Sequence, residues 1–221
     1  TSRAWQPSED GKRTLSPALF QEAVACRRTA TDYRPMNARI WQNMATTETV
    51  LGNIGAARER YRHIAMVAPG ESGVWRQWYT FEKRHGEPAH AREVVRRAAG
   101  IVPPDKAAAL YVMLAADEKQ AGRYVQALAD YRRALGYHRT YEVWREVAKL
   151  KAATGNKEGA IREWEVMTEK WPERWQPWWE LAKLELQQGN THAANVAFNR
   201  AIHLRPRLRE KADRLWDKAH R

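Results

Sequence analysis

The stretch that decides the fold covers residues 74–86 and reads VWRQWYTFEKRHG. The large aromatic residue Trp75 opens it, its apolar residues recur at spacings of three and four, and Gly86 closes it. This spacing predicts an amphipathic helix of about 13 residues. The glycine predicts the end of that helix, because a left-handed backbone costs glycine little.

The same pattern recurs along the chain in both directions from this stretch. Its glycines are spaced 33 to 36 residues apart, at Gly52, Gly86, Gly122, Gly155 and Gly189. Eleven residues before each glycine stands an aromatic residue: Trp41, Trp75, Tyr111, Trp144 and Trp178. Five residues after each glycine stands an alanine: Ala57, Ala91, Ala127, Ala160 and Ala194. A repeat of this length indicates stacked supersecondary units.

Each unit predicts a first helix, a turn and a second helix. The alanine allows the second helix to cross the first closely, and the bulky residue four positions later fills the space beside it. The bulky residues are Tyr61, Val95, Tyr131, Trp164 and Phe198. A proline such as Pro69 or Pro172 stops the second helix before the next unit. One helix pair cannot bury its own apolar face, so neighbouring pairs stack into a continuous core.

These residues resemble the tetratricopeptide (TPR) repeat over residues 38–206. An acid seven residues after the aromatic in four units, and Arg-Ala pairs such as Arg97-Ala98, resemble the half-a-TPR (HAT) variant more closely. The four acids are Glu48, Glu82, Glu118 and Glu185, and Lys151 takes this place in the fourth unit. The resemblance implies an all-α, right-handed α-solenoid of about five TPR/HAT-like helix pairs. Because HAT proteins mostly work in RNA processing, it also implies an association with RNA.

The repeat pattern divides the chain into consecutive segments. The five repeats are expected at 38–71, 72–105, 108–140, 141–174 and 175–206. Residues 1–14 are expected to form a flexible basic tail, and 15–37 a degenerate half repeat whose helix starts at Pro17. Residues 207–221 are expected to form a capping helix, apolar toward the last repeat and polar outward; the alternative is a basic helix on a membrane surface.

The composition favours a polyanionic partner. The formal net charge is +12 with a pI near 10.0, and a field of this sign attracts nucleic acids, anionic lipids or acidic protein segments. The single cysteine, Cys26, excludes an internal disulfide and fits a reducing compartment. No stretch approaches the roughly 20 apolar residues of a transmembrane helix. No catalytic motif, cofactor loop or metal-ligand spacing is present, so an enzyme and a metal site are not expected.

The repeat phase also predicts where a ligand lies. In this fold the first helix of each pair faces a concave groove, and that face carries basic residues in every unit, with Glu142 as its one acid. Thr80 and the amides of Gln42, Gln120, Gln176 and Gln187 share it. The predicted polyanion-binding residues are Arg39, Arg76, Lys83, Arg84, Lys119, Arg145, Lys149 and Lys183. Trp179 is expected either to stack on a base or peptide or to pack against the neighbouring unit.

The second helices add another basic surface, which includes Arg60 and Arg62 and could contact rRNA or another subunit. Two functions follow from these features. The first is an RNA-associated protein that binds single-stranded RNA or rRNA, or belongs to an organellar ribosome or processing complex. The second is a protein–protein scaffold in which the groove holds an acidic segment of another subunit of a larger, even membrane-bound, complex. An intracellular setting is expected for both, in the nucleus, mitochondrion or chloroplast.

Overall fold

The computed structural model describes residues 5–7, 13–15, 25 and 38–219. The chain forms two compact units, Thr1–Ala107 and Ala108–Arg221, and each is described by itself. The helical fold is an all-α solenoid of stacked helix pairs, as the repeat pattern predicted.

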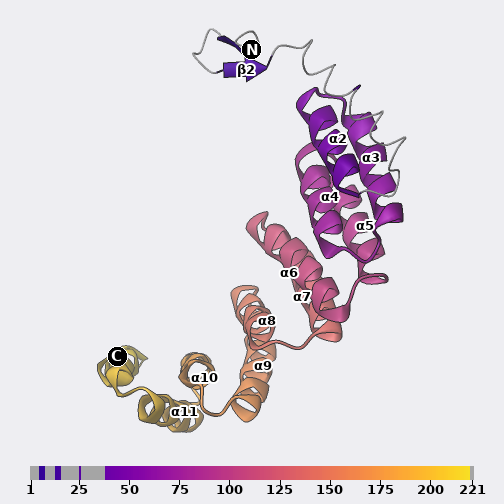
Figure 1. Ribbon diagram of the computed structural model, residues 1–221. Helices are drawn as coiled ribbons and strands as arrows, with labels where there is room; N and C mark the ends of the chain where they lie inside the picture. Colours follow the sequence, from indigo (N-terminus) through magenta and orange to yellow (C-terminus); the bar gives the residue numbers. More distant parts are fainter. Residues whose placement is uncertain (1–4, 8–12, 16–24, 26–37, 220–221) are drawn as a thin grey trace. The chain divides into compact units, whose positions relative to one another are not determined.

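Residues 38–107, the continuously described part of the first unit, contain two helical hairpins (Figure 1). Their helices are α2 (Ala38–Val50), α3 (Ile54–Val67), α4 (Ser72–His85) and α5 (Pro88–Ala99). The two helices of each hairpin contact each other, and α3 also contacts α4, so the hairpins share one core. The indole N–H of Trp75 donates to the carbonyl oxygen of Pro69 at 2.7 Å. The opening aromatic of one hairpin is therefore tied to the proline that closes the hairpin before it.

The second unit holds the remaining helices, and the boundary between the units falls in the first turn of α6. Its helices are α6 (Pro104–Gln120), α7 (Tyr124–Tyr137), α8 (Tyr141–Ala153), α9 (Lys157–Lys170), α10 (Trp175–Gln187), α11 (Thr191–Leu204) and α12 (Arg209–Ala219), with a short 3-10 helix η1 (Pro206–Leu208). The third hairpin begins at Pro104 rather than at residue 108, which accounts for the longer spacing between Gly86 and Gly122.

The repeated alanines and bulky residues lie in the core. The alanines Ala57, Ala127, Ala160 and Ala194 have no exposed surface, and Ala91 is almost fully buried. The bulky residues Tyr61, Val95, Tyr131, Trp164 and Phe198 are buried as well. Small side chains at the crossings let the helices approach, and large ones fill the space beside them, which is how interiors reach crystal-like packing density.

The linker glycines follow the predicted left-handed conformation in four units but not in the second. Gly52, Gly122, Gly155 and Gly189 have φ between 75° and 84°. Gly86 instead has φ −112° and ψ −174°. Pro88 starts α5 at its first position, and the residue before it, Glu87, has the extended backbone (φ −85°, ψ 153°) to which a residue before proline is restricted. The prediction for Gly86 is therefore wrong, because a two-residue extended linker replaces the left-handed turn.

Gly86 is needed for a different reason, which is the close approach of Glu82. A Cβ atom at residue 86 would lie 2.9 Å from the Glu82 carbonyl oxygen and collide with the Glu82 carboxylate. We expect Gly86→Ala to lower the free energy of unfolding by about 2 kcal/mol, since the buried carboxylate has no room to move. Gly55→Ala is the matched control, because nothing lies within 4 Å of its added Cβ. Urea titration should show no loss for that variant, and equal losses for both would contradict this interpretation.

The acids that resembled the HAT pattern are buried and bind the linkers and neighbouring helices. The amide of Asn53 donates to Glu48 at 2.8 Å, and that of Asn190 donates to Glu185 at 2.7 Å. Arg123 makes the same kind of contact with Glu118. In the fourth hairpin the polarity is reversed, and Lys151 donates to Glu163 at 2.5 Å. These residues stabilise the hairpins, so their pattern carries no information about an RNA partner.

Both ends of the chain differ in part from the predicted segments. Within the predicted tail, β1 (Trp5–Pro7) pairs antiparallel with β2 (Arg13–Leu15). The predicted helix after Pro17 lies outside the described residues, apart from Ala25. At the other end, Leu208 and Ala212 are buried and Trp216 is partly buried against the core of the second unit. The helix α12 therefore packs as a cap on the last hairpin.

Candidate functional site

A groove of about 480 Å³ lies between the first helices of the two hairpins in the first unit. One face of α2 forms one wall, with residues from three successive turns: Gln42, Asn43, Thr46, Thr49 and Val50. Residues of α4 form the other wall: Arg76, Gln77, Thr80, Phe81, Arg84 and His85. Tyr61 of α3 closes the base. The positions recur every three or four residues because one face of each helix points into the groove.

The groove is cationic and has no carboxylate among its lining residues. Arg76 and Arg84 stand two turns apart on α4, and both are exposed. Among the residues that the structure describes, neither forms an ion pair. A guanidinium without a protein partner presents a fork of donors that matches a carboxylate. Arg76 and Arg84 are therefore the anchoring points that this groove offers to an anion.

The remaining polar groups of the groove suit a peptide backbone. The hydroxyls of Thr46 and Thr80 donate to the carbonyl oxygens of their own helices at 3.0 and 2.9 Å. Thr46 also interacts with the hydroxyl of Tyr61, so Thr80 is the one of the two whose lone pairs are left to accept from a ligand. The amides of Gln42 and Gln77 make no hydrogen bond within the described part of the chain. Each amide can therefore donate to and accept from a peptide group at once.

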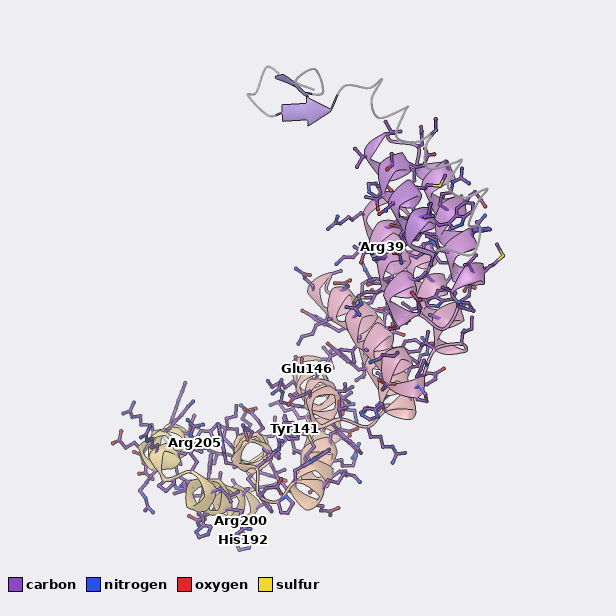
Figure 2. The ribbon with its side chains drawn as sticks, viewed as in Figure 1. Arg39, Tyr141, Glu146, His192, Arg200 and Arg205 are labelled. Atoms are coloured by element: carbon purple, nitrogen blue, oxygen red, sulfur yellow. The ribbon has the colours of Figure 1, made fainter. Side chains whose placement is uncertain are left out.

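The structure brings together some of the predicted site residues of the first unit and not others. Arg76 and Arg84, together with Thr80 and Gln42, line the groove as predicted. Arg39 on α2 (Figure 2) and Lys83 on α4 are exposed but do not line it. The sequence analysis missed Asn43, Thr46, Gln77 and His85. The first three lie three or four positions from a predicted residue and could have been found by extending the helical period, whereas His85 only adjoins Arg84.

In the second unit most of the predicted cations are paired with acids. Lys119 Nζ lies 2.7 Å from Glu146 Oε2, and Lys183 Nζ lies 2.6 Å from Glu180 Oε2. Arg145 contacts Glu142 at 3.0 Å and Glu146 at 3.6 Å. Figure 2 labels Glu146, which the sequence analysis did not place on this face. The expectation of Glu142 as the one acid there is wrong, because Glu146 and Glu180 also reach the predicted cations.

The ion pair between Lys119 and Glu146 shifts the pKa of both partners. The hydrogen bond to Glu146 raises the pKa of Lys119. Burial tends to raise the pKa of Glu146, but the hydrogen bond and charge of Lys119, with Lys149 and Arg145 nearby, lower it overall. Lys149 is exposed and has no ion pair closer than 4 Å among the described residues. The second unit is therefore much less able to bind a polyanion than its count of cations suggested.

Trp179 packs in the core instead of facing a ligand. It is 4% exposed, and its ring meets that of Phe198 edge-on at 5.2 Å between centroids. Lys211 of α12 lies 5.5 Å from its ring centroid. Of the two interpretations of Trp179, stacking on a base is wrong and packing is correct, because the neighbouring helices cover the ring.

The described ranges hold neither a metal-binding cluster nor a membrane-spanning helix. In this part of the chain no three His, Cys, Asp or Glu side chains gather into a group able to hold a metal ion. No helix there has the length and apolar character required to cross a bilayer.

No family model matches the chain, and no curated protein does. Solved structures do match it. The C-terminal part of a TPR repeat-containing protein from Cytophaga hutchinsonii matches with a TM-score of 0.56 and 12% identity, over 91% of this chain and 80% of that one. MamA matches with a TM-score of 0.52 and 14% identity, over 78% and 94% of the two chains. YrrB, described as a TPR protein with an unusual peptide-binding site, matches with a TM-score of 0.51 and 16% identity, over 81% and 92%.

At these identities the similarity shows the fold alone. The matches extend over most of the chain and over most of each related structure. They agree with the stacked helix pairs described above. The chain has the tetratricopeptide-like helical-repeat fold.

Proposed function

We propose that this protein is a non-catalytic protein–protein scaffold, and that the groove between α2 and α4 binds an extended acidic segment of a partner. The observation that carries the proposal is the composition of the groove: two unpaired arginines, several amides and hydroxyls, and no carboxylate. Arginine forks bind carboxylates in a bidentate manner. Peptide-binding grooves add a few placed polar groups that fix the orientation of the ligand.

The aromatic residues favour a peptide over single-stranded RNA. Proteins that bind single strands stack bases on exposed aromatic side chains. The two aromatic residues other than histidine in the groove, Tyr61 and Phe81, are 7% and 4% exposed. Neither ring face is available for stacking, and Trp179 is buried as well. The description of YrrB as having a peptide-binding site gives further support.

The first test compares an acidic peptide with RNA. A fluorescein-labelled dodecapeptide that alternates Asp and Gly, and a fluorescein-labelled oligouridine of equal length, are titrated by anisotropy at near-physiological salt. We expect the peptide to bind, and the double variant Arg76→Ala, Arg84→Ala to bind it at least about tenfold more weakly, because two charge-assisted contacts are lost.

The matched control removes the same charge elsewhere. Arg132→Ala with Arg162→Ala changes two exposed arginines on the second helices α7 and α9 of the second unit. This control should bind the peptide like the unchanged protein. Equal weakening in both double variants would mean that net charge alone attracts the peptide, and tighter binding of oligouridine through Arg76 and Arg84 would replace the proposal with an RNA-binding function.

A further inference from the structure

A second cavity, of about 630 Å³, lies in the first unit beside the second helices α3 and α5. Trp75 and Trp78 contribute to its lining but are only 3% and 5% exposed, and their rings stack at 5.7 Å between centroids. Met66 and Ile101 stand on the rim and are 71% and 50% exposed. Two large apolar side chains that stand in solvent beside one cavity are features of a surface that another chain covers.

The wall of this cavity carries two polar atoms that have no partner. His63 lies against the ring of Trp41 at 3.9 Å between centroids, and the guanidinium of Arg60 lies 5.3 Å from the same ring. Arg60 Nε and His63 Nε2 are both buried, and within the described structure neither makes a hydrogen bond. Buried polar groups are nearly always satisfied in folded proteins. Arg60 Nε is a donor, and so is His63 Nε2 when it carries a proton; the side chains that carry these atoms are partly exposed in the cavity wall.

Comparison with the fourth hairpin shows that the fold does not require these features. Glu163 stands eight residues after Gly155, as Arg60 stands eight after Gly52. There Glu163 accepts from the indole N–H of Trp144 at 2.6 Å and from Lys151 at 2.5 Å, so its oxygens are satisfied inside the protein.

The first hairpin also differs from the other hairpins at the rim of this cavity. The position of Met66, fourteen residues after the linker glycine, is occupied elsewhere by small, charged or polar residues: Gly100, Gly136, Glu169 and His203. Among the five hairpins, only the first has an exposed methionine and an arginine at these two positions. Met66 and Arg60 line the same cavity.

We propose that this cavity is a second docking site, whose ligand is a protein segment that presents a large apolar side chain beside a carboxylate. The apolar side chain would pack between Met66 and Ile101. The carboxylate would lie beside Arg60 and His63, whose side chains are partly exposed in the cavity wall. Charge complementarity favours this partner, because three arginines and one acid, Glu59, line the cavity. Arg62 is bound to Glu59 at 2.5 Å and Arg97 to Glu93 at 2.9 Å, so Arg60 is the lining arginine without an ion pair among the described residues. The site is separate from the groove between α2 and α4, so it does not depend on the function proposed for that groove.

The test uses the full chain with methyl-13C methionine and follows the Met66 methyl signal, assigned with Met66→Leu. The probe is a capped decapeptide that alternates Glu with Leu and Phe. A second peptide replaces Leu and Phe by Ser, and a third replaces Glu by Lys. We expect only the first peptide to shift the Met66 signal saturably, while the signal of buried Met44 stays unchanged.

Two acidic substitutions give the matched comparison. Met66→Glu should weaken binding of the first peptide by about tenfold or more, because it places a charge where the apolar side chain lies. Val125→Glu, at a residue that is 78% exposed on α7, should bind normally. Arg60→Met should also weaken binding, whereas Arg76→Ala with Arg84→Ala should not.

Four results would overturn the proposal. The Met66 signal could stay unchanged with every peptide, as it would if residues 16–37 of this chain filled the cavity. The serine or lysine peptide could bind as well as the first. Met66→Glu could leave the affinity intact. Finally, the Arg76 and Arg84 double variant could abolish the Met66 shift, which would place the peptide in the groove.

Discussion

Replacing Trp164 by alanine is expected to lower the free energy of unfolding by about 4 kcal/mol, the largest effect of any substitution considered for this protein. Trp164 is 1% exposed on α9 and belongs to the core cluster of the second unit, with Met167, Trp179 and Phe198. Truncating a buried tryptophan removes its transfer free energy and leaves a cavity that the neighbouring helices fill only in part.

The measurement is a urea titration followed by far-UV circular dichroism. Trp164→Phe should lose less than Trp164→Ala, because a smaller cavity remains. Val196→Ala, at a residue that is half exposed on α11, should change the free energy by less than about 0.5 kcal/mol. A loss below about 1 kcal/mol for Trp164→Ala would mean that the helices close over the space and that the repeated bulky residue is not a packing requirement.

Replacing Arg58 by methionine is expected to lower the free energy of unfolding by about 3 kcal/mol. Arg58 of α3 binds Glu82 of α4 through two parallel hydrogen bonds, with Nε–Oε1 at 2.8 Å and Nη2–Oε2 at 2.9 Å. Glu82 is 1% exposed, and the Trp78 N–H at 3.0 Å would be its remaining close donor. Removing one partner of a buried pair leaves the other charge uncompensated.

The loss should depend on pH in a defined direction. Burial tends to raise the pKa of Glu82, but the hydrogen bonds from Arg58 and Trp78 outweigh it and hold this pKa below the ordinary value of 4.5. In the unchanged protein, ionised Glu82 therefore contributes stability above pH 4.5 that is lost as the pH falls through its folded-state pKa. Arg58→Met removes the largest of these offsets to burial and leaves those of Trp78 and His90, so we expect the pKa of Glu82 to rise. The difference between the two proteins should then shrink as the pH falls from 7 toward 4.

Arg62→Met provides the control for this pair. Arg62 binds Glu59 at 2.5 Å, but both side chains are more than half exposed, and exposed pairs contribute less than about 1 kcal/mol. Urea titrations at several pH values should therefore show little change for Arg62→Met. Equal losses for the two variants, or a loss at Arg58 that grows as the pH falls, would contradict the role given to the buried pair.

Much of the fold could be predicted because its signals are local. Trp75 and Gly86 lie on one helix, and the period of three and four between them is a property of that helix alone. Ala160 and Trp164 are one turn apart, so their packing roles follow from the same period. Gly86 shows where this reasoning failed. The repeat pattern suggested a left-handed turn, but Pro88 imposed an extended linker, a local signal that the repeat had hidden.

The charge of the candidate site could be predicted only in part. Arg76 and Arg84 could be placed on one face because they lie two turns apart on one helix. Whether a cation is free depends on residues from other helices. Lys119 on α6 meets Glu146 on α8, 27 residues later in the chain. No local period reports such a contact, so the second unit was expected to be more basic in its groove than it is.

The sequence by itself determined the helical repeat, because helix formation, helix ends and the need of each hairpin for a neighbour all depend on residues within about one repeat length. Only the tertiary structure decided which charges are available. The buried acids bind linkers and neighbouring helices, most cations of the second unit bind acids, and Trp179 lies under Phe198 and Lys211. The physical reason is that ion pairing and burial depend on distances between side chains of different helices, which exist only after those helices have packed.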